Sequence, residues 1–310
     1  MKYLKYFDNV SAYEAYKNGS DYILPNVSYV VETKGVSYEP KIEVGKYKIG
    51  VLLKKDISKF TYNMVDLGLP SGTLWADRNV GATSPEDYGA VFAWGETEGY
   101  CVEKKHMTDE EMCALFQPLL GDEMTLTPDN IDEFMAGAIG GTPEDLAAIN
   151  YDLYSVGTIF SLEKPFSSEW LDYFDTTDGG STFNKYNNNG GLTVLQPEDD
   201  AATVNMGSNW RMPTNDEMQE LRQYCDFEVD VWDTKPYKFT SKINGNSITI
   251  PAPLTVQDSI AYIDSSYDRV WSSELYDENN KKALTCYIYN SSAGGFDEYR
   301  YVGLPVRGVK

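Results

Sequence analysis

The sequence predicts an α+β protein in two parts. Capping patterns predict short helices, strand-like stretches are separated by Gly, Pro and Asn turns, and the charge is divided unevenly. Residues 1–60 hold ten Lys against seven Asp and Glu, although the chain of 310 residues has a formal net charge of −22. We therefore expect a small α+β or β-rich N-terminal domain at 1–60 and a loop-rich domain at 61–310 with a helical insertion at about 101–160.

The N-terminal part is expected to hold one short helix followed by strands. Ser11 and Glu14 form a capping-box pattern, and Asn18-Gly19 would end the helix that it opens. Residues 29–32 and 36–38 flank a Thr-Lys-Gly turn, which indicates a hairpin, and residues 47–53 are typical of a further strand.

Three short helices are expected between about 108 and 154. Thr108 and Glu111 form a capping box, whereas Thr127 and Thr142 each precede a Pro that would take the first helical position. Gly140-Gly141 would end the second of these helices.

The part that follows the insertion is expected to combine one helix with several short strands. Thr214 and Glu217 form another capping box, which opens a helix with Cys225 on its apolar side. Asn244-Gly245 lies between strand-like residues and indicates a hairpin. The last forty residues alternate aromatic strand-like pieces with Asn, Ser and Gly loops.

The composition favours recognition of a partner. The chain contains 24 Tyr, which are amphipathic and rigid and so suit contact surfaces as well as cores. Its negative charge repels nucleic acid and anionic membrane surfaces, and the absence of any apolar run near 18 residues argues against membrane insertion. Residues 1–8 lack the apolar core of a signal peptide, so we expect synthesis in the cytoplasm without export by that route.

The residues that catalysis requires are sparse. The four cysteines (Cys101, Cys113, Cys225 and Cys286) are far apart, which favours reduced, mostly buried thiols over a zinc knuckle or a disulfide framework. The single histidine, His106, excludes any site that needs two. G-x-S-x-G, G-x-G-x-x-G and Walker-type loops do not occur. We therefore expect a protein that is not an enzyme and binds neither cofactor nor metal.

Five blocks of sequence, in a fixed order, carry a family resemblance. They are VDLGLPSGTLWA (65–76); NVGA (79–82) with PEDYG (85–89) and FAWGE (92–96); PEDDAA (197–202); WRMPT (210–214); and VWSS (270–273) with a closing VR (306–307). Together they resemble the Fibrobacter succinogenes major paralogous domain, a C-type-lectin-like fold abundant in Bacteroides-type gut bacteria and their phages. The resemblance covers residues 64–310 apart from the insertion. Trp75, Trp94, Trp210 and Trp271 would then be buried scaffold residues.

Two minority interpretations concern the same blocks. Gln196-Pro197-Glu198 looks like a calcium-dependent sugar-binding motif of lectins, but it is better explained as a helix start with Pro197 in the first position. The WRMPT block also resembles a block in formylglycine-generating enzymes, which are a catalytic branch of the same fold and rely on reactive cysteines. Cys286 has no cysteine partner at close spacing, so a binding role is favoured over that activity.

The tail from Trp271 onward resembles the variable region of proteins diversified by retroelements, which expose Asn, Tyr, Ser and Asp on a fixed lectin frame. Such side chains combine contact area with adaptable hydrogen bonding, as antibody loops do. The alternative is that alternate residues of these strands are core or solvated edge. The candidate ligand-binding residues are Tyr276, Asp277, Asn279, Asn280, Tyr287, Tyr289, Asn290, Phe296, Asp297, Tyr299 and Tyr301.

Residues 21–29 (DYILPNVSY) look like the opening segments of virion proteins in phages of those bacteria. The two resemblances together imply a virion protein of the tail-fibre or receptor-binding type. Its N-terminal domain would bind other virion proteins, and its head would bind a host cell-surface glycan or protein. By analogy with fibre proteins we also expect a homo-oligomer. The alternatives are a head fibre or capsid decoration protein, or a host-encoded surface adhesin.

Overall fold

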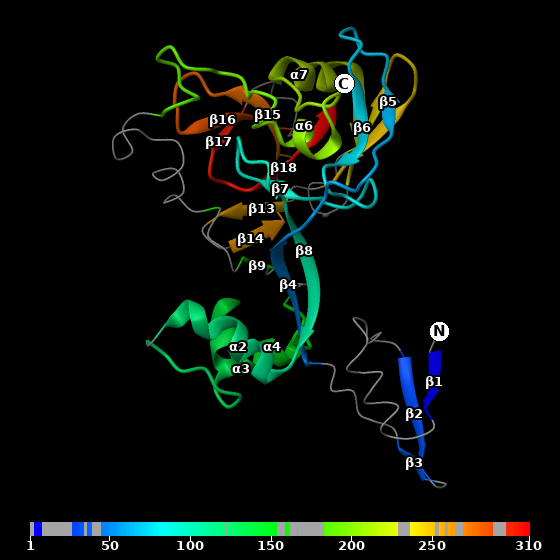
Figure 1. Ribbon diagram of the computed structural model, residues 1–310, viewed down its shortest axis with the longest axis vertical. Coiled ribbons are helices and arrows are strands. Elements are labelled where there is room, and N and C mark those ends of the chain that lie inside the picture. Colours follow the sequence, from blue (N-terminus) through cyan, green and yellow to red (C-terminus); the bar gives the residue numbers. More distant parts are fainter. Residues whose placement is uncertain are drawn as a thin grey trace. The chain divides into compact units, whose positions relative to one another are not determined.

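The computed structural model shows a mixed α+β protein in which strands predominate (Figure 1). It describes residues 3–7, 27–33, 36–38, 45–121, 123–153, 159–161, 166, 183–228, 236–251, 254–257, 260–263, 269–287 and 296–310. No helix within these ranges is long and apolar enough to cross a membrane.

The chain forms two compact units, each built from segments that are distant in sequence. Unit 1 comprises Met1–Lys48 and His106–Tyr151, and unit 2 comprises Ile49–Lys105 and Asp152–Lys310. The helical stretch interrupts unit 2 in the sequence, but its contacts group it with the N-terminal residues. The boundary also falls before residue 60, within strand β4 (Tyr47–Lys54).

A small sheet contains the first described strands of unit 1. β2 (Val27–Thr33) pairs in parallel with β1 (Tyr3–Phe7) and antiparallel with β3 (Val36–Tyr38). The pairing of β2 with β3 confirms the expected hairpin. The helix expected at residues 11–18 lies outside the described residues.

The described residues of unit 1 include the helices α2 (Asp109–Leu120), α3 (Ile131–Ala138) and α4 (Pro143–Ala148). The capping box at Thr108 is confirmed, and so is the cap at Thr142 with Pro143 at the first helical position. The expected start of a helix at Thr127-Pro128 is wrong. The side chain of Asn130 accepts a hydrogen bond from the Thr127 amide (2.8 Å) and donates one to the Thr125 carbonyl (2.9 Å), so this segment forms a turn before α3 begins.

Residues at the start of β4 contact these helices. The Tyr47 side chain is fully buried, its ring meets the Tyr151 ring edge-on at 5.5 Å, and its hydroxyl donates to Asp132. The Lys46 amine lies 2.8 Å from Asp132 and 3.0 Å from Asp109. These contacts explain why the helices group with the N-terminal segment. No local pattern marks them, because the partners lie 85 or more residues apart in the chain, except for Lys46 and Asp109.

The described strands of unit 2 form four sheets. The largest has the order β13-β14-β9-β4-β8-β7-β18, and the others have the orders β10-β11-β12, β15-β16-β17 and β19-β6-β5. The bounds of these strands are Met64–Asp66 (β5), Leu74–Asn79 (β6), Val91–Phe92 (β7), Tyr100–Met107 (β8), Ile159–Ser161 (β9), Cys225–Glu228 (β10), Tyr237–Ser241 (β11), Ser247–Ile250 (β12), Leu254–Gln257 (β13), Ile260–Ile263 (β14), Arg269–Leu275 (β15), Lys282–Tyr287 (β16), Phe296–Tyr299 (β17), Leu304–Pro305 (β18) and Arg307–Val309 (β19). The hairpin of β11 and β12 is confirmed, with Gly245 at a φ of +78° in its turn.

Two short helices cover parts of these sheets. α7 (Asn215–Tyr224) begins with the expected capping box at Thr214 and packs against β15 and β16 (Figure 1). α6 (Ala201–Met206) packs against β19. The expected helix start at Pro197 is wrong, because Asp200 is the N-cap. Its carboxylate accepts hydrogen bonds at 2.8 Å from the amides of Thr203 and Met212, which fixes the helix start at that residue.

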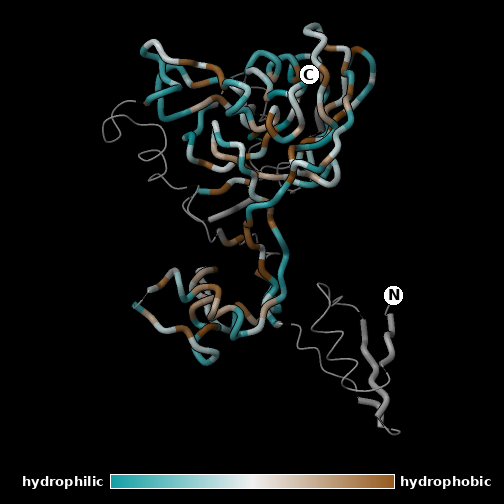
Figure 2. Tube along the Cα trace, in the orientation of Figure 1, coloured by the Kyte–Doolittle hydropathy of each residue, from teal (hydrophilic) through white to brown (hydrophobic). Residues whose placement is uncertain are grey.

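Buried tryptophans hold the loops of unit 2 together. Trp75, Trp94 and Trp271 are fully buried, and Trp210 is 8% exposed, which confirms the expected scaffold role. Trp94 and Trp271 belong to one hydrophobic cluster, and Trp75 belongs to another. Figure 2 shows hydrophilic residues along the outer loops of this unit. A fold with little regular structure needs such large side chains, because each buries an apolar area worth on the order of 2–3 kcal/mol.

Candidate functional site

The candidate surface is the sheet β15-β16-β17 together with the turn at residues 276–281, which joins β15 to β16. Two tryptophans fix β15 to the core. The Trp271 indole donates to the Phe92 carbonyl (2.8 Å), and the Trp94 indole donates to the Ser272 carbonyl (2.9 Å). These two hydrogen bonds attach β15 to Phe92, the last residue of β7, and to Trp94, which follows β7.

The turn has its own internal hydrogen bonds. The Tyr276 amide donates to the Lys282 carbonyl (3.1 Å), and the Lys282 amide donates to the Asn279 carbonyl (2.9 Å). The Asn279 side chain accepts from the Lys281 amide (3.0 Å). The turn is therefore a defined loop whose backbone groups are largely satisfied, although its side chains lie at the surface.

The Asn188 side chain attaches a second loop to this turn. It donates to the main-chain carbonyls of Tyr276 (3.2 Å) and Asp277, and the Asn188 amide donates to the Asn280 side chain (2.9 Å). The neighbouring Asn187 is buried, and its side chain accepts from the Gly191 amide (3.1 Å), which closes the loop that carries Asn188. The sequence interpretation missed both residues, although the run Asn-Asn-Asn-Gly-Gly at 187–191 signals a tight turn with Asx hydrogen bonds.

A buried arginine lies beneath the turn. Arg300 is fully buried, and its guanidinium lies 4.8 Å from the Trp94 ring centroid and 4.9 Å from the Phe183 ring centroid. One guanidinium nitrogen donates to the Asn280 carbonyl at 3.4 Å. The aromatic rings stabilise the buried guanidinium charge by cation–π contacts. The guanidinium in turn fixes the backbone at Asn280 through its hydrogen bond.

Side-chain pairs connect β17 to its neighbours. Lys282 forms an ion pair with Asp297, and its amine lies 4.8 Å above the Tyr299 ring. The hydrogen bond to Asp297 raises the pKa of Lys282. Arg269 forms a second ion pair, with Glu298. Asp297 is thus held in place by a partner within the chain while it remains partly exposed.

Among the predicted residues, Tyr276, Asp277, Asn279, Asn280, Asp297 and Tyr299 lie at least partly exposed on the turn and on β17. The Tyr276 hydroxyl donates to Glu278 (3.0 Å), which raises the pKa of Tyr276. Tyr299 is 38% exposed. The backbone of Tyr287 lies opposite Arg269 in the sheet, and that of Phe296 lies opposite Thr285. Tyr289 and Asn290 lie outside the described residues.

Tyr301 does not fit the predicted contact surface. It is only 6% exposed and belongs to the hydrophobic cluster that contains Trp94 and Trp271. Its ring stacks on Tyr299 with centroids 5.5 Å apart, and its hydroxyl accepts from the Gln257 side chain at 3.1 Å. β17 ends at Tyr299 and Tyr301 lies in the turn that follows, so the two side chains differ in environment even though their rings touch. We therefore assign Tyr301 to the frame of the site.

The described cysteines are poorly suited to thiolate chemistry. Burial raises the pKa of Cys101 and of Cys225 to about 11, and it also raises the pKa of Cys113. All three are free thiols. Within the described part of the chain, no group of three or more His, Cys, Asp or Glu side chains is placed to hold a metal ion.

Comparisons with models of known protein families, with curated proteins and with solved structures found no match to this chain.

Proposed function

We propose that the chain is a virion structural protein of the tail-fibre or receptor-binding type, made by a phage of Bacteroides-type gut bacteria. Unit 2 would be a C-type-lectin-like head that binds a host surface glycan or protein without catalysis. The N-terminal residues would attach the protein to other virion proteins, in a homo-oligomer. The resemblance of the sequence blocks motivates this proposal, and the geometry of the candidate surface supports its binding part.

One observation carries the binding part of the proposal. The side chains of Asp277 and Tyr299 lie exposed, and that of Tyr276 lies partly exposed, on a frame that main-chain hydrogen bonds and buried tryptophans hold in place. A rigid frame binds with a small loss of conformational entropy, because the contact residues are ordered before the partner arrives. Tyrosine, amide and carboxylate groups suit the hydroxyls of a glycan and the polar backbone of a protein.

The test is binding of the purified full chain to intact cells of candidate gut hosts, with and without a chelator. Saturable binding to a subset of strains that resists the chelator is expected. Loss of binding with the chelator would favour a calcium-dependent lectin, and binding to no strain would contradict the receptor-binding role.

Point variants test the surface itself. Tyr299→Ala and Tyr276→Ala should weaken cell binding by about 1–3 kcal/mol each, the cost of truncating a central aromatic contact, while circular dichroism stays unchanged. Ile243→Ala is the matched control, because Ile243 is 52% exposed on the β11–β12 turn of the same unit. Equal binding by all three variants and the wild type would rule out this surface as the contact.

A further inference from the structure

Residues 192–195 add a fourth row to the sheet β15-β16-β17. Two main-chain hydrogen bonds, of 2.9 and 2.8 Å, join this segment to β15, and between them Val194 lies opposite Glu274 in an antiparallel bridge. The same register places Leu192 opposite Tyr276. The segment is therefore continuous with the candidate surface.

The side chains of these rows alternate between the core and the outside. Leu195 and Leu275 are buried, whereas Leu192 and Val194 are 40% and 42% exposed. The buried Ala283 lies opposite Leu275, so the residues on either side of each point outward together. Row by row, the outward side chains are those of Leu192 and Val194, of Tyr276 and Glu274, of Lys282 and Leu284, and of Tyr299 and Asp297.

Three aliphatic side chains on this outward face suit a protein better than a glycan. Leu192, Val194 and Leu284 offer no hydrogen-bonding group, so the hydroxyls of a sugar placed over them would lose water without gaining a partner. Single exposed aliphatic residues are common on protein surfaces, but these three share one face with Tyr276 and Tyr299. A face that mixes aliphatic and aromatic side chains is typical of a contact between proteins.

The charges on the outward face leave one carboxylate oxygen available to a partner. Lys282 and Asp297 neutralise each other as an ion pair. One oxygen of the Glu274 carboxylate accepts from the Asn215 amide (2.6 Å), and among the described residues the other oxygen has no hydrogen bond. Glu274 lies between two of the aliphatic side chains across the rows, so a basic side chain of a partner reaches it beside apolar contacts.

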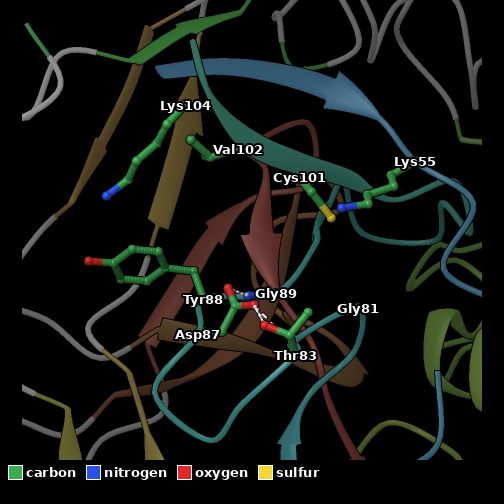
Figure 3. A pocket seen from close by; sticks show the side chains of 9 residues that line it. All are labelled: Lys55, Gly81, Thr83, Asp87, Tyr88, Gly89, Cys101, Val102 and Lys104. Atoms are coloured by element: carbon green, nitrogen blue, oxygen red, sulfur yellow. Dashed lines mark hydrogen bonds between the residues drawn. The ribbon is translucent and has the colours of Figure 1, made fainter. Parts of the chain in front are cut away.

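Asp277 adds a second carboxylate at the end of the outward face. Its side chain is exposed, and within the described ranges it has no hydrogen bond or ion pair. The Asp87 carboxylate, by contrast, is used within its own loop, because it accepts from the Thr83 amide (2.9 Å) and hydroxyl (2.8 Å), as Figure 3 shows. The opposite charges of Glu278 and Lys281 in the same turn cancel, so the charge that remains for a partner is negative.

We propose that the outward face binds an extended protein segment that presents apolar and basic side chains together. This inference rests on the receptor-binding role proposed above and names a protein, not a glycan, as the receptor. Outward side chains recur at every second residue, about 6.6 Å apart, which is also the spacing of alternate side chains in an extended segment. Apolar groups of the partner would lie over Leu192, Val194 and Leu284, and a basic group beside Glu274.

A second copy of this chain fits the outward face less well. It would bring Glu274, Asp277 and a net charge of −22 against like charges. The same charges favour a partner with basic groups, and its binding should weaken as salt is raised.

Fluorescence anisotropy of a labelled peptide, Val-Thr-Lys-Thr-Val-Thr, titrated with the full chain tests the inference. Two matched peptides carry Glu in place of Lys, or Ser in place of both Val. Saturable binding of the first peptide, about tenfold tighter than that of either matched peptide, is expected. Leu192→Ser and Val194→Ser should each lower the affinity about fivefold. Val204→Ser is the matched control, because Val204 is 49% exposed on α6 of the same unit.

Several results of this titration would overturn the inference. These are no saturable binding of the first peptide, equal binding of either matched peptide, unchanged affinity in both Leu192→Ser and Val194→Ser, and an equal loss in Val204→Ser. Equal binding of the peptide with Ser would show that the negative charge of the chain alone attracts lysine.

Treated cells of a bound strain separate this inference from the receptor proposal. Proteinase K should abolish binding of the full chain, whereas periodate, which cleaves the vicinal diols of sugars, should leave binding unchanged. Binding that survives proteinase K or is lost with periodate would overturn this inference while the receptor proposal stands. If no strain is bound, the receptor proposal fails, and the peptide titration alone decides whether the outward face binds a protein segment.

Discussion

The carboxylate of Glu217 joins three segments of unit 2, so replacing it should cost stability in a pH-dependent way. Glu217 accepts two hydrogen bonds from the Arg211 guanidinium (2.7 and 2.5 Å), one from the Thr73 hydroxyl (2.7 Å) and one from the Thr214 amide (2.9 Å). Burial alone would raise the pKa of Glu217, but these hydrogen bonds outweigh burial and lower the pKa to about 2.

The lowered pKa sets the size and sign of the effect. A fall from the ordinary value of 4.5 to about 2 corresponds to an upper limit of about 3 kcal/mol of stabilisation. The Arg211 side chain is 45% exposed, so solvent screening reduces this to about 2 kcal/mol. Because the folded-state pKa lies below the unfolded one, the contribution is complete above about pH 4.5 and is lost as the pH falls toward 2.

Urea denaturation followed by tryptophan fluorescence measures this effect in unit 2, since all six Trp lie in that unit. Glu217→Gln should lower the free energy of unfolding by about 2 kcal/mol at pH 7, and the gap to the wild type should close between pH 5 and pH 2. Asp216→Asn, which removes an exposed charge from the same helical turn, is the control. A gap that stays constant over this pH range, or an equal loss in Asp216→Asn, would refute the reasoning.

Two further predictions concern buried donors in the same unit. Trp271→Phe removes the indole that donates to the buried Phe92 carbonyl and leaves a small void, so the free energy of unfolding should fall by about 2–4 kcal/mol in urea denaturation followed by circular dichroism. A loss below about 0.5 kcal/mol would show that this hydrogen bond does not anchor β15. Arg307→Lys should cost about 2–4 kcal/mol in the same assay, because the buried guanidinium donates to three separate oxygens and a lysine amine cannot reach them all; an unchanged midpoint would contradict this.

Local patterns predicted the helices whose start depends on adjacent residues. The capping boxes at Thr108 and Thr214 and the cap at Thr142 were each identified correctly, because the hydrogen bonds that define them join residues three positions apart. At Pro197 the same reasoning failed. The start of α6 depends on Asp200, which also accepts from an amide twelve residues later, and a long-range contact of this kind leaves no local pattern.

In the candidate surface, too, local features could be predicted from the sequence and long-range contacts could not. Its tyrosine and asparagine content is visible in the sequence, and the partial exposure of Tyr276 and the exposure of Tyr299 agree with a contact surface. The support beneath the turn is not visible, because Asn188 lies 88 residues from Tyr276 and Arg300 contacts a carbonyl 20 residues away. The burial of Tyr301 was also unpredictable, since composition cannot tell which of two neighbouring tyrosines faces the core.

The turn at residues 276–281 contains two kinds of side chain. Some hold the loop in shape through hydrogen bonds, and others can be replaced without loss of those bonds. The Asn279 and Asn280 side chains each accept a hydrogen bond from a backbone amide, so changing them would disturb the loop. Tyr276 and Asp277 contribute only main-chain carbonyls to the contact with Asn188. The side chains of Tyr276 and Asp277 can therefore be replaced without loss of the contact with Asn188. A binding surface that is to recognise different partners on one fixed backbone needs positions of this kind.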